Sequence, residues 1–160
     1  MPCRVSTTPL RLVLDTNIVM DMLHFRDTRT DWLKSAIARR QVLCFSDADC
    51  LGELGRVASY PEFGLDDARQ EKLLGAYLDF VTRCDAAEES TAALPRCRDA
   101  DDQKFLELAA RCKADLLITR DKQLLRLDRH RHKPLPFAIV TAEKAATLLE
   151  FPAEHPASVF

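Results

Sequence analysis

The chain has 160 residues, and its 23 lysine and arginine residues nearly balance its 25 aspartate and glutamate residues, for a formal net charge of −2. With 47% apolar and 30% charged residues, the composition is typical of a folded domain and excludes a largely disordered chain. The balance also excludes binding to nucleic acid by bulk charge alone. No apolar run approaches the roughly 20 residues that span a bilayer. We therefore expect one cytoplasmic domain over 1–160, with its core over about 10–149 and no membrane partner.

Short apolar runs alternate with amphipathic segments along the chain. In the first half, the pattern predicts a strand over 10–14, helices over about 18–23 and 30–40, a strand over 42–45, a helix from 48 to about 60, and a helix from 66 or 67 to 81. In the second half, it predicts a long connection over 85–95, a helix from about 101, a strand over 116–119, a short helix around 124–125, a basic tract over 126–136, a strand over 137–140 and a helix over 141–150. This alternation is typical of an α/β protein with a central, mostly parallel sheet flanked by helices.

Two acidic residues come directly after predicted strands. Asp15 follows the first strand, and Asp121 follows the strand over 116–119. In parallel α/β sheets, ligands bind at the carboxyl ends of strands, where successive connections diverge to opposite faces. We expect Asp15 and Asp121 to meet at these ends, with Glu53 and Asp102 packed over them from two helices.

Each of these acids also has a purely structural interpretation. Asp15 can cap a helix, Glu53 can be an exposed helical charge, the run from Asp99 to Asp102 can complement a helix dipole, and Asp121 can form a turn. If they converge, however, bare carboxylates within a few ångströms repel each other unless a proton or cation intervenes. Mg²⁺ and Mn²⁺ prefer oxygen ligands, so converging acids favour a hard divalent metal site.

Four blocks of the sequence carry a resemblance to a known family. They are LVLDTN at 12–17, LGEL at 51–54, CRDADDQKFL at 97–106 and ADLLITRDKQLL at 114–125. Taken in this order, they make the chain resemble the PIN-domain family of metal-dependent ribonucleases over about Leu10 to Leu149. The nearest branch is the one described as toxin components of bacterial toxin–antitoxin pairs. The resemblance implies a three-layer PIN-like fold and a single PIN-like domain.

The resemblance also implies a set of site residues. The catalytic and metal-binding acids would be Asp15, Glu53, Asp102 and Asp121, with Asp99 and Asp101 competing for the place of Asp102. We favour Asp102 because Phe105 and Ala109 lie near the same helical face. The residues expected to hydrogen-bond and orient these carboxylates are Thr16, Asn17 and Thr119. Two departures from the family pattern, Ala100 in place of a proline and Arg120 in place of a glycine, remove no acid.

The implied reaction is the hydrolysis of RNA phosphodiester bonds by an Mg²⁺- or Mn²⁺-dependent endoribonuclease. A bound ion would lower the pKa of a water and stabilise charge on the phosphate oxygens. A basic tract after the last acidic block is expected to hold RNA phosphates, or else to be a solvated surface loop. Its candidate RNA-binding residues are Arg120, Lys122, Arg126, Arg129, Arg131 and Lys133.

Two other functions fit part of this pattern. The first is an Mg²⁺-dependent phosphatase with Asp15 as an aspartyl nucleophile, although that chemistry typically needs a carboxylate where this chain has Asn17. The second is a PIN-like module that binds RNA or protein without cutting. The resemblance further implies an antitoxin partner and self-association as a homodimer, for which the helices around Trp32 or over 73–81 offer apolar contacts.

Overall fold

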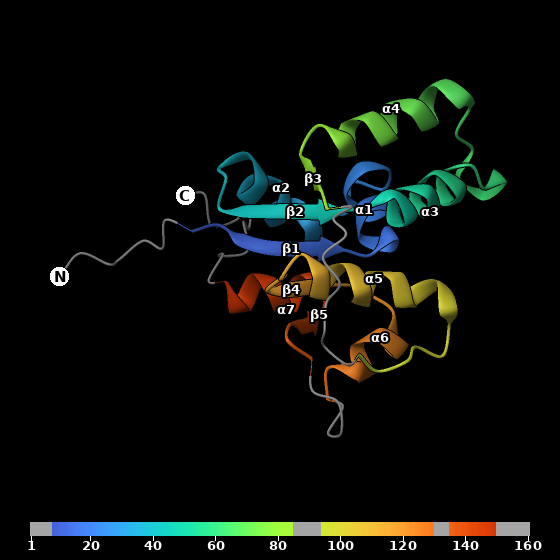
Figure 1. Ribbon diagram of the computed structural model, residues 1–160. Helices are drawn as coiled ribbons and strands as arrows, with labels where there is room; N and C mark the ends of the chain where they lie inside the picture. Colours follow the sequence, from blue (N-terminus) through green and yellow to red (C-terminus); the bar gives the residue numbers. More distant parts are fainter. Residues whose placement is uncertain (1–7, 85–93, 130–134, 150–160) are drawn as a thin grey trace.

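A five-stranded parallel sheet forms the centre of the protein (Figure 1). The computed structural model describes residues 8–84, 94–129 and 135–149. In chain order, the strands are β1 (Leu10–Leu14), β2 (Val42–Ser46), β3 (Val81–Arg83), β4 (Leu116–Ile118) and β5 (Ala138–Val140). The order across the sheet is β3-β2-β1-β4-β5, and every neighbouring pair is parallel. The predicted α/β fold with a mostly parallel sheet is therefore confirmed.

Helices cover both faces of this sheet. They are α1 (Thr16–Leu23), α2 (Asp31–Ala38), α3 (Ala48–Ala58), α4 (Asp67–Leu78), α5 (Ala100–Arg111), α6 (Lys122–Leu127) and α7 (Ala142–Leu148), with short 3-10 helices at Thr28–Thr30 and Pro61–Phe63. Apolar side chains from α1, α2, α3, α4 and α7 pack on one face. The other face is covered mainly by α5 and α6. These are the three layers that the PIN-like fold implies.

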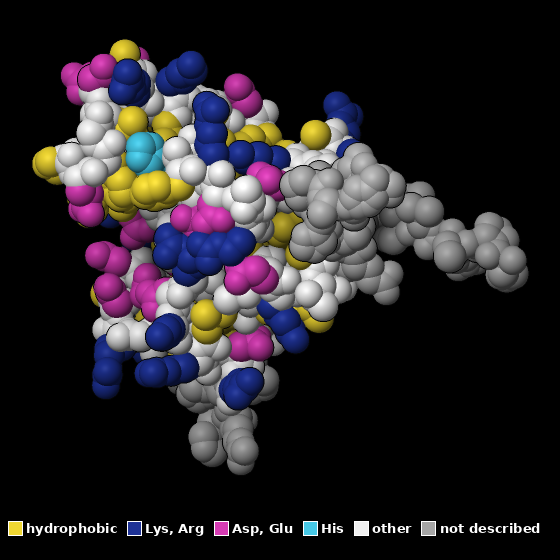
Figure 2. Space-filling view, turned by 180° about the vertical axis from the view of Figure 1, so that it is seen from behind, with side chains coloured by type: hydrophobic (Ala, Val, Ile, Leu, Met, Phe, Trp, Pro, Cys, Tyr) yellow, Lys and Arg dark blue, Asp and Glu magenta, His cyan; other side chains and the backbone are white. Residues whose placement is uncertain are grey.

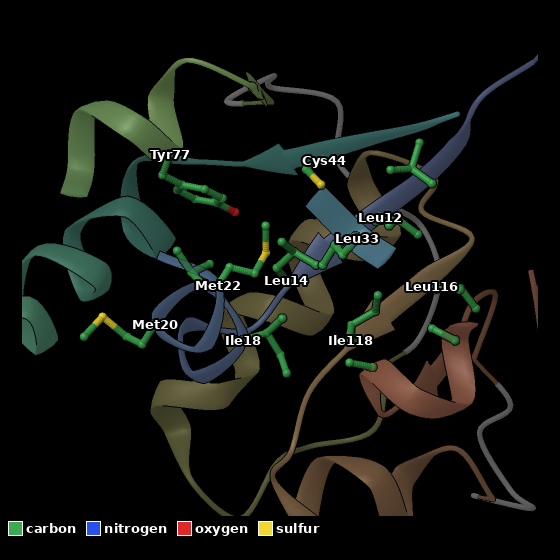
Figure 3. Close-up of a cluster of buried hydrophobic side chains, with 14 of the residues drawn as sticks. Leu12, Leu14, Ile18, Met20, Met22, Leu33, Cys44, Tyr77, Leu116 and Ile118 are labelled. Atoms are coloured by element: carbon green, nitrogen blue, oxygen red, sulfur yellow. The ribbon is translucent and has the colours of Figure 1, made fainter. Parts of the chain in front are cut away.

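The strands divide their side chains between the two faces because successive residues of a strand point in opposite directions. Leu12 and Leu14 of β1 belong to the core under α1, whereas Val13 between them belongs to the core under α5. In β4, Leu117 likewise faces α5 and α6. Figure 3 shows the first core, where strand side chains meet those of α1 such as Ile18. A sheet buried on both faces explains why its strands read as continuous apolar runs.

The order of the strands creates a switch point between β1 and β4. The chain leaves β1 through α1 on one face and runs on to β2, whereas it leaves β4 through α6 on the other face and runs on to β5. Connections that diverge in this way leave a crevice outside the carboxyl ends of the two strands. Asp15 and Asp121 follow these two ends.

Some sequence-based expectations are corrected. Val81 does not continue the preceding helix, because α4 ends at Leu78 and Val81 begins β3, where it pairs with Cys44 of β2. Self-association through the helices around Trp32 or over 73–81 stays a prediction, because Trp32, Leu73 and Tyr77 are buried in this chain's own core whereas Leu78 on α4 is 44% exposed. Most of the predicted connection over 85–95 and part of the basic tract lie outside the described residues.

Within the described residues, every helix is too short or too polar to cross a membrane.

The core of the central sheet should dominate stability. Leu117 on β4 is 0% exposed, so Leu117→Ala should lower the free energy of unfolding by about 2–5 kcal/mol through lost burial and a residual cavity. The matched control is Leu148→Ala on α7, where Leu148 is 50% exposed and the change should stay within about 0.5 kcal/mol. Urea unfolding monitored by circular dichroism measures both, and equal losses would contradict this assignment of the core.

Candidate active site

A single threonine links the ends of β1 and β4. The Thr119 hydroxyl donates a hydrogen bond to Asp15 Oδ2 at 2.6 Å and accepts one from the Asp121 backbone N–H at 2.9 Å. Asn17 Nδ2 also lies 3.3 Å from Asp15 Oδ2. The two strand ends therefore bring Asp15 and Asp121 together, as the sequence predicts, and Thr119 and Asn17 orient the Asp15 carboxylate.

The helix-capping interpretation applies to some of the acids only. Asp15 stands at the N-cap of α1, but its side chain makes no capping hydrogen bond. Asp121 and Asp99 do cap, because Asp121 Oδ1 accepts from the Gln123 N–H at 2.8 Å and Asp99 Oδ1 accepts from the Asp101 N–H at 2.9 Å. The Asp15 carboxylate is thus left to serve the crevice rather than the helix.

These strand ends open into a pocket of about 400 Å³. Helices α3 and α5 supply the acids on its other sides. Its lining residues are Asp15, Thr16, Asn17, Met20, Phe25, Glu53, Val57, Phe63, Asp99, Asp101, Asp102, Arg120 and Asp121. We call this space the acidic pocket. All six acids proposed from the sequence, the two competitors included, face it.

Among the competing acids of α5, Asp102 has the closest relation to the strand ends. It is partly buried, and its pKa is raised first by that burial and then by the nearby charges of Asp121 and Asp15. Asp101 is exposed, and Asp99 is occupied as a cap. The first turn of α5 therefore directs Asp102 toward the other acids.

Burial and mutual repulsion make the charged forms of two acids unfavourable. Asp15 is only 5% exposed, and burial raises its pKa to about 6, with the charges of Glu53 and Asp121 adding to the shift and the Thr119 hydrogen bond opposing it. Burial also raises the pKa of Asp102 to about 7, helped by the charges of Asp121, Asp15 and Asp99. A nearby cation would stabilise the ionised form of both carboxyls and lower their pKa values.

Glu53 already has such a cation. Lys104 Nζ of α5 lies 2.7 Å from Glu53 Oε1, with the two side chains 15% and 14% exposed. The Thr16 hydroxyl donates to the other oxygen, Oε2. Lys104 carries no signal in the sequence, because nothing in the spacing along α5 indicates that it faces α3. The Lys104 ammonium therefore competes with a metal ion for Glu53 Oε1.

A second ion pair lies at the wall of the acidic pocket. Arg120 donates from Nε to Asp21 Oδ2 at 2.7 Å and from Nη2 to Asp21 Oδ1 at 3.0 Å. Arg120, predicted to bind RNA, is thus held beside the pocket by a carboxylate. Asp21 was not predicted as part of the site, although an acid within one turn of Ile18 and Met22 on the buried side of α1 is a usable signal.

One wall of the acidic pocket is apolar. Met20, Val57, Phe25 and Phe63 line it, and Phe25 and Phe63 meet edge to face with ring centroids 5.8 Å apart. The ring of His24 packs against both. Figure 2 shows hydrophobic side chains gathered around a histidine, with acidic and basic side chains beside them.

The other predicted RNA-binding residues that the structure describes do not line the acidic pocket. Lys122 and Arg129 are exposed at the two ends of α6, and Arg126 on α6 is exposed above another pocket. Arg131 and Lys133 lie outside the described residues.

The donor set of the acidic pocket suits a hard cation. Across residues 8–84, 94–129 and 135–149, no three His, Cys, Asp or Glu side chains already form the ligand set of one ion. Mg²⁺, however, keeps several waters and binds through as few as one or two carboxylates. Burial raises the pKa of Asp15 and of Asp102, so such an ion would stabilise their ionised carboxylates, and the Asp121 carboxylate lines the same pocket.

Without a divalent ion, the stability of the protein should vary with pH because burial, and then the charges of Glu53 and Asp121, disfavour the ionised Asp15 carboxylate. Because the folded pKa is raised from 3.8 to about 6, the folded state binds more protons in this window, so the free energy of unfolding falls as pH rises through it. The decrease in the free energy of unfolding that Asp15 causes is at most about 3 kcal/mol, and it should be absent in Asp15→Asn. Urea unfolding in EDTA at several pH values measures it, and identical pH profiles for both proteins would contradict the assignment.

Removing the Lys104 charge should strengthen metal binding. Lys104→Gln frees Glu53 Oε1 and removes a positive charge from the pocket, so the protein should bind Mn²⁺ about threefold to tenfold more tightly. Calorimetric titration with MnCl₂ measures the Kd. Lys72→Gln, on the exposed side of α4, is the control and should leave it unchanged. Unchanged or weaker binding by Lys104→Gln would show that the ammonium does not oppose the ion.

Comparison with known proteins gives a family and a fold. The family model described as PIN domain matches residues 11–123, more than half of the chain. The structure is similar to a chain in the crystal structure of VapBC2 from Rickettsia felis bound to a DNA fragment from their promoter, with a TM-score of 0.56 and 14% identity. That match covers 81% of this chain and 97% of the other. No curated protein matches the chain.

The matched family segment contains β1, α3, α5 and β4, the four elements that supply or precede the acids of the pocket. The chain therefore belongs to the PIN-domain family, whose members are generally nucleases.

Proposed function

We propose that this PIN domain is a metal-dependent endoribonuclease and the toxin of a toxin–antitoxin pair. One observation carries the catalytic part of the proposal. Glu53 and Asp21 have ion-pair partners in Lys104 and Arg120, whereas no Lys or Arg among the described residues pairs with Asp15, Asp102 or Asp121. The unpaired acids are thus the ones that need a cation from solution.

We assign Asp15, Asp102 and Asp121 as the residues that hold Mg²⁺ or Mn²⁺, with Glu53 as a fourth acid at the edge of the site. When bound, the ion supplies a water of lowered pKa and stabilises charge on the phosphodiester oxygens. Asp99 and Asp101 are left outside this set because both are exposed at the start of α5. Family members generally use divalent metals, in agreement with this donor set.

The surrounding side chains fix the acids in place. Thr119 and Asn17 hold the Asp15 carboxylate, and Thr16 holds Glu53. Lys104 and Arg120 bring positive charge to the pocket, which lowers the repulsion that a phosphodiester would meet there. This arrangement favours substrate binding at a site that would otherwise repel RNA.

The phosphatase alternative is supported less well. An aspartyl-phosphate mechanism needs an acid near the nucleophile to protonate the leaving group. The residue two positions after Asp15 is Asn17, whose amide orients Asp15 and carries no transferable carboxyl proton. Metal-assisted attack by water requires no acid at that position.

The toxin role and the partners rest on the family and on the fold. The similar fold in the VapBC2 structure supports an antitoxin as the protein partner, and the acidic pocket is the surface that such a partner would cover to block cleavage. RNA as the substrate, a cytoplasmic location and a homodimer complete the proposal.

The proposal predicts metal-dependent cleavage that requires the unpaired acids. With Mn²⁺, the protein should cleave single-stranded RNA, and Asp15→Asn and Asp121→Asn should each lose at least about 100-fold in rate because each removes an ion ligand. Gel analysis of labelled RNA measures the rates, with EDTA abolishing them.

The control for this experiment is Asp79→Asn, an exposed acid at the end of α4, which should keep full activity. Expression in cells provides a second readout, since the original chain should arrest growth and Asp15→Asn should not. Equal cleavage by all the proteins would exclude the site, and a phospho-aspartate trapped at Asp15 would favour the phosphatase. RNA binding without cleavage would favour the non-catalytic module.

A further inference from the structure

A second pocket lies on the other side of Asp102. It has a volume of about 250 Å³, and Asp102 lines both this pocket and the acidic pocket. Arg96 and Arg98, from the segment that precedes α5, meet Arg126 of α6 around it. We call it the arginine pocket. Its cations come from segments about 30 residues apart, and only Arg126 among them was selected from the sequence.

The three arginines are available to a ligand. Within the described part of the chain, no carboxylate forms an ion pair with Arg96, Arg98 or Arg126. By contrast, Arg111 and Arg120 are each tied to an aspartate. Three unpaired guanidinium groups around one cavity form a strong attraction for an anion, and the fork geometry of guanidinium matches phosphate oxygens.

The segment that carries two of these arginines is held to α5. Gln103 Oε1 accepts a hydrogen bond from the Cys97 N–H at 2.7 Å, and Gln103 Nε2 donates to the Pro95 carbonyl at 3.2 Å. The Gln103 side chain therefore forms hydrogen bonds with the backbone on both sides of Arg96. The result is a fixed support for Arg96 and Arg98 next to Asp102 rather than a free loop.

The base of the pocket is apolar. Leu124 is buried, and Leu127 is partly buried beside it on α6. The volume is below the roughly 300–1,000 Å³ of sites for drug-sized ligands. Cations around a small cavity with an apolar base suit a single phosphate together with part of its nucleoside.

We propose that the arginine pocket binds the phosphate of the RNA nucleotide that adjoins the bond cut in the acidic pocket. This inference rests on the proposed nuclease function. Its basis is that Asp102 forms a wall of both pockets, so a chain that crosses Asp102 passes from one into the other. The shared wall favours RNA over an acidic peptide, because of these two ligands only RNA has a phosphodiester for each pocket.

The two pockets attract RNA by different means. The acidic pocket accepts a phosphate only with a cation bound, whereas the arginine pocket accepts one directly. Binding measured in EDTA therefore reports on the arginines without cleavage. In that state, charge neutralisation by arginine appears as a dependence of affinity on salt concentration.

The test compares the full chain with the triple variant Arg96→Gln, Arg98→Gln, Arg126→Gln. The probe is a fluorescent single-stranded RNA of randomised sequence, about 12 nucleotides long, followed by anisotropy in EDTA. The triple variant should bind about tenfold to 100-fold more weakly, and its salt slope should fall by about two to three. Arg39→Gln, an exposed arginine at the opposite end of the sheet, should leave both unchanged.

Cleavage of the same RNA with Mn²⁺ separates this inference from the proposed function. If the arginines act only in binding, the triple variant should raise KM about tenfold or more while kcat stays near that of the original chain. If the original chain cleaves RNA but the triple variant binds and cleaves it equally well, the arginine pocket is overturned and the nuclease stands. If arginine-dependent binding occurs without any cleavage, the nuclease is overturned and the pocket remains a phosphate site.

A polyglutamate peptide is the second binding probe, and it tests whether the arginine pocket prefers RNA to an acidic peptide. Equal affinity for this peptide and for RNA, lost by the same factor in the triple variant, would identify the pocket as a site for acidic peptides and overturn its assignment to RNA.

Discussion

Repulsion among carboxylates is the constraint around which the carboxyl end of this sheet is organised. Folding places Asp15 and Asp121 at neighbouring strand ends and packs Asp102 of α5 against them, so that burial and like charge both disfavour the ionised forms of Asp15 and Asp102. Such an arrangement costs free energy in the absence of a counter-ion. The surrounding hydrogen bonds from Thr119 and Asn17 lower this cost without removing it.

The protein neutralises some of these acids internally and leaves others open. Glu53 and Asp21 are paired with Lys104 and Arg120, each across two elements that meet only in the folded chain. These pairs confine the unbalanced negative charge to the centre of the acidic pocket. A divalent ion placed there would stabilise the fold as well as provide Lewis-acid chemistry, so metal binding and stability are coupled.

Helix α5 separates two environments of opposite charge. Its first turn presents Asp102 to the acids of the strand ends, and the segment just before it presents Arg96 and Arg98 to the other side. A substrate with repeating phosphates can use both, since one phosphate needs an ion and the next needs only guanidinium groups. Under the proposed function, the helix would combine cleavage with positioning of the RNA chain.

Local sequence patterns determined the strands of the described sheet other than β3, most of the helices and the acids of the site. Apolar runs and helical spacing depend on residues close along the chain, and acids that directly follow parallel strands must collect at one edge of the sheet, so Asp15 and Asp121 could be placed together in advance. The prediction that Val81 is helical was wrong, because a single apolar residue after a helix fits both the helical spacing and the start of a strand. The partner of Glu53 and the convergence of Arg96 with Arg126 were decided only by the tertiary structure. These contacts join distant segments, and their geometry depends on how α3, α5 and α6 pack, which no local spacing encodes.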